Sequence, residues 1–158
     1  MRSPYHFFVS ELLKSAGVLC FALFCSPAFA ALGQDVSSVQ ADRAHMKAEV
    51  SVLPASAYSI HEMRSPAGIT VREFVSPAGQ VFGVSWQGPQ IPDLRQLLGE
   101  HFDEYMQAAE NSPRIYRRVV HIETGDLVFE SGGHMKFFLG RAYLRSKLPD
   151  GASADVIH

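Results

Sequence analysis

Two side chains in the first half of the sequence could do acid–base chemistry together. His61 and Glu73 lie on either side of a Ser-Pro-Ala-Gly segment. If that segment forms a hairpin loop, the two residues face each other on neighbouring strands, with Gly83 next in line on a third strand. An imidazole beside a carboxylate suits general acid–base catalysis or recognition of a small polar ligand. The alternative is a surface ion pair, with the glycine placed for strand twist.

The single tryptophan offers a second candidate site. Trp86 precedes Gln-Gly-Pro, so it could form a stacking platform for a sugar or an aromatic ligand, or it could cap the core. The serine just before it does not fit a hydrolase elbow, because the segment 83–88 reads G-V-S-W-Q-G and its second glycine stands one position too far. The sequence has neither a Walker-type loop nor a dinucleotide fingerprint, so we predict no cofactor.

Histidine spacing does not predict a metal site. The histidines after residue 30 include no pair on one helical turn, and His101 with Glu104 offers at most two ligands. Both cysteines, Cys20 and Cys25, lie in the first thirty residues, so no thiolate ligand follows them. The formal net charge is −2 with signs interspersed, which gives no basic stripe for nucleic acid. We predict neither a metal nor a nucleic-acid partner.

The first thirty residues are typical of a cleavable signal peptide. Arg2 and Lys14 lie in a polar segment, an apolar run covers 16–25, and a small-x-small triplet ends at Ala30. The apolar run is about half of the ~20 residues that a membrane-spanning helix needs. We therefore expect cleavage between Ala30 and Ala31, export to the periplasm or the medium, and no stable membrane insertion afterwards. The mature protein would be cysteine-free and held together by packing.

The tetrapeptide Ser-Pro-Ala-Gly occurs at 65–68 and again at 76–79, and it predicts two hairpin loops. Proline sets the first central residue of a type I turn, and the glycine accepts a left-handed conformation. Two such loops make a three-stranded meander whose register follows by counting. Glu62 should then face Arg72 as a register-fixing ion pair, and Phe74 should face Phe82 on the core side.

The pattern on either side of the meander predicts two helices and three further strands. Apolar residues recur at helical spacing over 34–50 and, more strongly, over 93–109, where Asp93 is placed to cap the helix. Strand-like runs follow at 115–123, 127–131 and 134–144, and the last two are separated by Gly132-Gly133, a strong hairpin signal.

The order of these elements predicts an α+β fold. Helix, three strands, helix and three strands favour antiparallel meander sheets, with the helices packed on the apolar face that carries Phe74 and Phe82. Residues 31–149 fit one domain, and residues 150–158 are expected to form a flexible tail. The pattern leaves open whether the six strands form one sheet or two.

Three segments together make the chain similar to a known family. These are 71–89 (VREFVSPAGQVFGVSWQGP), 92–99 (PDLRQLLG) and 131–136 (SGGHMK). The chain resembles a bacterial family of small exported proteins catalogued only as a domain of unknown function. The resemblance runs from residue 31 to about 149. It implies periplasmic or secreted placement, and it assigns no functional residues.

Two classes of function remain open on the sequence. The first is a non-enzymatic binding or interaction module with a small ligand or an envelope or extracellular partner. The second is a small acid–base hydrolase or lyase that uses His61 and Glu73. An enzyme needs a cleft around His61, whereas a binding module can present a sheet face.

Overall fold

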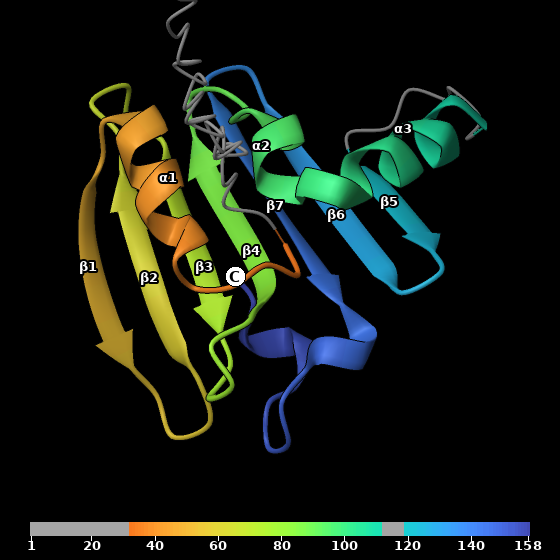
Figure 1. Cartoon of the computed structure of the whole chain (residues 1–158). Coiled ribbons are helices and arrows are strands. Elements are labelled where there is room, and N and C mark those ends of the chain that lie inside the picture. Colours follow the sequence, from red (N-terminus) through yellow and green to blue (C-terminus); the bar gives the residue numbers. More distant parts are fainter. Residues whose placement is uncertain (1–31, 112–118) are drawn as a thin grey trace, which may run out of the picture.

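Seven antiparallel strands form a single sheet in the computed structural model, which describes residues 32–111 and 119–158 (Figure 1). The strand order across the sheet is β1-β2-β3-β4-β7-β6-β5. The strands are β1 (Glu49–Pro54), β2 (Ser59–Arg64), β3 (Thr70–Val75), β4 (Val81–Gly88), β5 (Val119–Thr124), β6 (Leu127–His134) and β7 (Phe137–Leu144). The α+β class with an antiparallel sheet is therefore confirmed, and the strands belong to one sheet.

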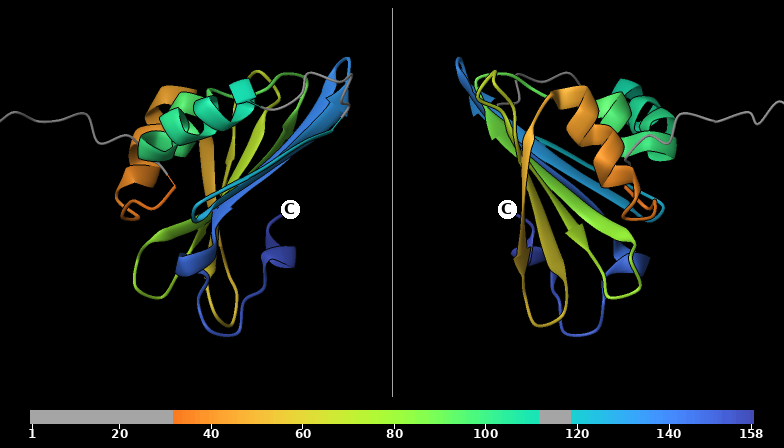
Figure 2. Two further views of the ribbon diagram at one scale, coloured as in Figure 1. Left: turned by 90° about the vertical axis from the view of Figure 1, so that its right-hand side faces the viewer. Right: turned by 60° about the vertical axis from the view of Figure 1, so that its left-hand side comes forward.

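The α-helices of the described residues lie on one side of the sheet. They are α1 (Ser38–Met46), α2 (Leu94–Leu98) and α3 (Phe102–Asn111), with a 3-10 turn at Gly99–His101 between the last two. Figure 2 shows them together on one side, while the segment 152–158 lies on the other. We call these two sides of the sheet the helix face and the open face.

The first hairpin follows the predicted register. Glu62 pairs with Arg72 and His61 pairs with Glu73 across β2 and β3. The loop closes through a hydrogen bond from the Ser65 amide to the Ile69 carbonyl at 2.9 Å, and Gly68 adopts a φ of 80°. The second loop repeats this geometry, with Gly79 also at 80°. Both loops are confirmed as left-handed glycine turns.

The second hairpin differs from the prediction by one residue. Val75 pairs with Val81 as expected, but Phe74 pairs with Gly83 and not with Phe82. A β-bulge inserts Phe82 as an extra residue, so Phe82 and Gly83 both lie on the open face. Counting residues from the loop cannot detect such an insertion. The extra residue places every later residue of β4 on the face opposite to the one predicted.

The prediction that the helices pack over Phe74 and Phe82 was wrong. Those two rings are fully buried on the open face, with centroids 6.2 Å apart, and Ile157 packs against them. The helices instead cover a larger cluster that includes Met63, Val71 and Trp86. Both faces of β3 and β4 are apolar, so the sequence pattern alone could not decide which one the helices cover.

The helices and the strand order also differ in detail. The helix expected over 34–50 ends at Met46, because Lys47 takes a left-handed conformation and an unpredicted strand, β1, follows. The observed order is thus one helix, four strands, a broken helix and three strands. The helix expected over 93–109 does start at its Asp93 cap, whose Oδ1 accepts from the Arg95 amide at 3.0 Å. It breaks at Gly99, which has a φ of 53°.

Two expectations for the second half also need correction. The turn between β6 and β7 lies at 135–136, with Lys136 at a φ of 72°, while Gly132 and Gly133 continue β6. Gly133 is required by close packing, since a Cβ there would lie 2.3 Å from the Phe137 carbonyl oxygen. The 150–158 tail is not loose: Ile157 is fully buried against the sheet. The first residues of the strand expected over 115–123 lie outside the described residues.

Candidate functional site

The pair predicted to do acid–base chemistry is largely withdrawn from solvent, since Glu73 is buried and His61 is half-buried. His61 and Glu73 face each other as predicted, but on the helix face, where α1 lies over the sheet (Figure 1). Glu73 is only 1 % exposed, and neither residue lines either of the two cavities described below. The burial of Glu73 also excludes the alternative of a surface ion pair.

Gly83 and Trp86 occupy sites that differ from those predicted. Gly83 lies on the open face, away from His61, and a Cβ there would lie 2.6 Å from Cδ1 of Ile157. The space above this glycine is therefore filled by Ile157. Trp86 is 3 % exposed on the helix face, and its ring packs 5.5 Å from that of Phe129. Trp86 caps the core and offers no exposed stacking platform, although it is among the residues that line the groove described below.

The helix face buries an acidic cluster that the sequence did not reveal. Asp42 on α1 is fully buried, lies close to Glu73 and accepts a hydrogen bond from Nε2 of Gln96 on α2. Two buried carboxylates side by side would repel each other, so such a pair holds one proton between them. We expect Glu73 to carry that proton, while Oδ2 of Asp42 and Oε2 of Glu73 are buried with no hydrogen-bond partner among the described residues.

Burial sets the ionisation of this cluster. It raises the pKa of Asp42 to about 6, against the opposing hydrogen bonds from Glu73 and Gln96. Burial, together with the neighbouring Asp42, raises the pKa of Glu73 well above its usual range. Burial lowers the pKa of His61, so its imidazole is neutral at pH 7, and its Nδ1 is buried with no partner among the described residues. The cluster therefore connects α1 and α2 to β3 in the interior of the protein.

The open face carries a continuous row of polar residues that crosses six strands. Each member is the cross-strand partner of the next, so the side chains stand side by side. We call this the polar row: Glu62, Arg72, Ser85, Arg141, Glu130 and His121. Its order is nearly symmetrical about the central serine, with an arginine and then a glutamate on either side.

Two ion pairs hold the arginines of the polar row in place. Nε of Arg72 donates to Oε2 of Glu62 at 2.8 Å, and Nε of Arg141 donates to Oε2 of Glu130 at 2.6 Å. These hydrogen bonds lower the pKa values of both glutamates, so both pairs are charged at neutral pH. His121 adds a contact to Oε1 of Glu130 at 3.0 Å. The two guanidinium groups are thus fixed on either side of Ser85.

The same arginines also hold the segment 152–158 on the sheet. Nη1 of Arg72 donates to the carbonyl of His158 at 2.8 Å, and Nη1 of Arg141 donates to the carbonyl of Ala154 at 3.0 Å. This segment covers one end of the open face. The Nη2 groups of both arginines have no hydrogen-bond partner among the described residues.

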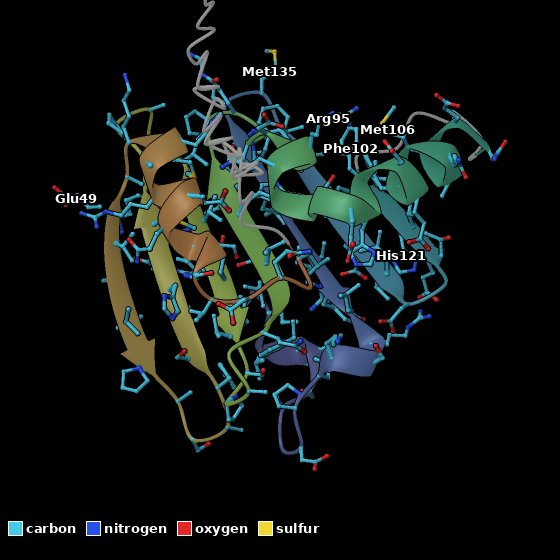
Figure 3. The ribbon with its side chains drawn as sticks, in the orientation of Figure 1. Glu49, Arg95, Phe102, Met106, His121 and Met135 are labelled. Carbon is cyan, nitrogen blue, oxygen red and sulfur yellow. The ribbon has the colours of Figure 1, made fainter. Side chains whose placement is uncertain are left out.

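A groove of about 540 Å³ lies over the polar row. Its lining includes Ile157 and His158 of the C-terminal segment and His121 on β5, which Figure 3 labels. Beyond the polar row its lining continues over a less polar set, again in cross-strand order: Thr70, Gln87, Leu139, Gly132 and Val119. The groove therefore combines charged donors on one side with apolar side chains on the other.

A smaller cavity of about 310 Å³ lies on the opposite side of the molecule, lined among others by His45, Asp93 and Gln96. Within residues 32–111 and 119–158, no three His, Cys, Asp or Glu side chains gather closely enough to hold a metal ion. Nor does any helix in these ranges combine the length and the apolarity needed to cross a membrane. The larger groove on the open face is thus the better candidate for a binding site.

Most of the residues in the polar row could not be brought together from the sequence. Glu62 and Arg72 were paired correctly, because the first loop was recognised. Arg141 and Glu130 were not paired, because the turn was expected at Gly132-Gly133 and lies at 135–136. A two-residue turn centred on Met135 and Lys136 would have brought Glu130 opposite Arg141 by the same counting.

Fold and site together define an α+β domain with one antiparallel sheet, helices on one face and a polar-floored groove on the other. Residues 28–157 match the model of the family described as "Protein of unknown function (DUF2844)", and the chain belongs to that family. This confirms the resemblance stated from the sequence. The comparisons with curated proteins and with solved structures gave no match.

Proposed function

We propose that the mature domain is an exported, non-enzymatic binding module that holds a small amphipathic ligand in the open-face groove. One observation carries the proposal: two arginines, fixed by glutamates, stand on either side of Ser85 in the floor of the groove and keep free donors. Ligand sites typically pair apolar walls with a few fixed polar groups, as this groove does. No observation favours the hydrolase or lyase that would use His61 and Glu73.

The groove suits a ligand with an acceptor-bearing head group and an apolar body. A carboxylate can accept from the Nη2 groups of Arg72 and Arg141, because charge-assisted bonds to guanidinium are strong and directional. Their glutamate partners balance the charge, so the site does not demand a polyanion. The apolar body would lie over Leu139 and Val119, which are 49 % and 62 % exposed without it.

The groove can be filled by a single substitution at Gly132. This glycine lines the groove within β6, and its φ is outside the positive region, so an L side chain fits the backbone. Gly132→Val should lower the affinity for decanoate at least tenfold in titration calorimetry, because the added methyl groups occupy the ligand's space. The melting temperature should change by no more than a few degrees, since valine suits a strand.

The matched control is Ser51→Val on the exposed edge strand β1, outside the groove. It adds a similar apolar volume and should leave decanoate affinity unchanged. Decanol, which lacks the carboxylate, should bind more weakly than decanoate. Equal decanoate affinity in the wild type and in Gly132→Val would refute the groove as the site.

Export is the second part of the proposal, and it rests on the sequence of the first thirty residues. The apolar run 16–25 and the small-x-small triplet before Ala31 support a cleaved signal peptide. Intact-mass analysis of protein recovered from the producing cells should give a chain that begins at Ala31. A recovered chain that keeps Cys20 would contradict cleavage.

A further inference from the structure

Four exposed apolar side chains gather at one end of the sheet, whereas Leu53, also exposed on the open face, lies on β1 away from them. Val119 is 62 % exposed, Met135 88 %, Phe137 44 % and Leu139 49 %. Phe137 and Leu139 alternate with Arg141 along β7, so they share the open face, and Leu139 reaches Val119 through Gly132. We call Val119, Met135, Phe137 and Leu139 the apolar tip.

The β6–β7 hairpin extends one rung beyond its pairing with β4. Its last rung joins His134 to Phe137, whereas β4 pairs with β7 only as far as Phe138. Figure 2 shows this hairpin leaning away from the helices, and Figure 3 places Met135 at its end. The most exposed apolar side chain of the tip is therefore at the outermost point of the hairpin.

The charged side chains at the end of the hairpin that carries Met135, Phe137 and Leu139 have one sign. Residues 131–140 contain no Asp or Glu, while His134 and Lys136 stand at the turn itself. An apolar side chain at a projecting turn, next to a cation with no acid nearby in its hairpin, is complementary to the surface of a bilayer that contains anionic lipids. A flat protein interface would not need the side chains at such a projecting point.

The tip is also continuous with the groove. Val119 and Leu139 belong to both, so an apolar surface runs from the turn at 135–136 to the polar row. We propose that the β6–β7 turn docks the domain on an anionic lipid surface, with Met135 and Phe137 entering the interface and Lys136 meeting the head groups. The groove mouth then faces the membrane. Membrane docking does not depend on the proposed function. Only the idea that the membrane supplies the ligand of the groove rests on it.

The test is co-sedimentation of the purified protein with vesicles. The wild type should bind vesicles of phosphatidylglycerol and phosphatidylcholine more tightly than vesicles of phosphatidylcholine alone, and salt should weaken the binding. Met135→Ser/Phe137→Ser should lower the partition coefficient at least tenfold, and Lys136→Glu should remove the preference for anionic lipid. Neither change touches a residue that lines the groove.

The matched control is Val52→Ser/Leu53→Ser on β1, where the two side chains are 55 % and 49 % exposed. This variant should bind vesicles like the wild type. Equal loss in both double variants would show unspecific adsorption and overturn the inference, as would a wild type that does not sediment with vesicles. Self-association that depends on Met135 and Phe137, without vesicle binding, would overturn it in favour of a protein contact.

Decanoate titration separates this inference from the proposed function. Met135→Ser/Phe137→Ser should keep its decanoate affinity within about twofold, and Gly132→Val should keep its vesicle binding. A protein that binds vesicles but not decanoate would refute the groove ligand and leave the docking surface standing. A protein that binds decanoate but no vesicles would refute the docking surface alone.

Discussion

The free energy of unfolding should fall as the pH rises from about 5 to 8. The unfolded chain releases the protons of Asp42 and Glu73 near their ordinary pKa values, whereas burial in the folded protein raises both. The folded state therefore binds more protons than the unfolded state in this range, and stability falls with increasing pH. For Asp42, a shift from 3.8 to about 6 corresponds to about 3 kcal/mol, which is lost mostly between about pH 4 and pH 6, and the further loss above pH 6 comes from Glu73.

Other groups near the cluster change the size of this effect but not its sign. Burial lowers the pKa of His61, so this imidazole alone would make the protein more stable as the pH rises to about 7. His45 on α1 opposes the shift of Asp42, and Asp93 adds to it. The contribution of Glu73 extends to higher pH than that of Asp42, because its carboxyl group holds the shared proton.

The substitution Glu73→Gln isolates the cluster. The amide keeps the shape of the side chain and can donate to Asp42, but it cannot ionise. Urea unfolding should show a variant that is more stable than the wild type at pH 8, by about 1–3 kcal/mol, with a weaker pH dependence. Glu110→Gln on the exposed end of α3 is the control and should follow the wild type. Parallel curves for the wild type and Glu73→Gln would contradict the buried acid pair.

The second large effect is expected where Ile157 packs over Gly83. Ile157 is fully buried with Phe74 and Phe82, so Ile157→Ala should lower the free energy of unfolding by about 2–5 kcal/mol. Gly83→Val should cost a similar amount, because its Cβ would lie 2.6 Å from Cδ1 of Ile157 and would displace that side chain. Denaturant unfolding measures both, and limited proteolysis should cut the released segment 152–158.

The double variant gives the sharper result. In the Ile157→Ala background, the larger side chain of Gly83→Val has more space. The losses in the free energy of unfolding caused by the two substitutions should therefore not add, and their coupling free energy should exceed about 1 kcal/mol. Ile91→Ala is the control, since Ile91 is 48 % exposed and its truncation should change stability little. Strict additivity of Gly83→Val and Ile157→Ala would place Ile157 somewhere other than over Gly83.

The first hairpin could be predicted from sequence because its loop chemistry is local. Proline and glycine set the backbone of each Ser-Pro-Ala-Gly loop, and the register of β2 and β3 then follows by counting. The bulge at Phe82 could not be predicted by counting, since no local signal marks it, and it places Gly83 under Ile157, a residue more than seventy positions away in the sequence. That single insertion moved Gly83 away from His61 and put the predicted site on two different faces.

The candidate site depended even more on distant pairings. Arg72 and Arg141 meet on either side of Ser85 only because β7 returns to pair with β4, and no local signal specifies that neighbour. The acidic cluster was missed for a related reason. Asp42 belongs to a short helix whose sequence predicts a solvated charge, and only the packing of α1 on the sheet buries it against Glu73.

The open-face groove is proposed to bind an amphipathic carboxylate, and amide chemical shifts during a decanoate titration report which residues such a ligand contacts. We expect saturable shifts at Thr70, Ser85, Gln87 and Gly132 in the wild type, and at least tenfold weaker binding in Gly132→Val. Shifts confined to His45, Asp93 and Gln96, which line the smaller cavity on the other face, would contradict it. So would a wild-type spectrum that decanoate leaves unchanged.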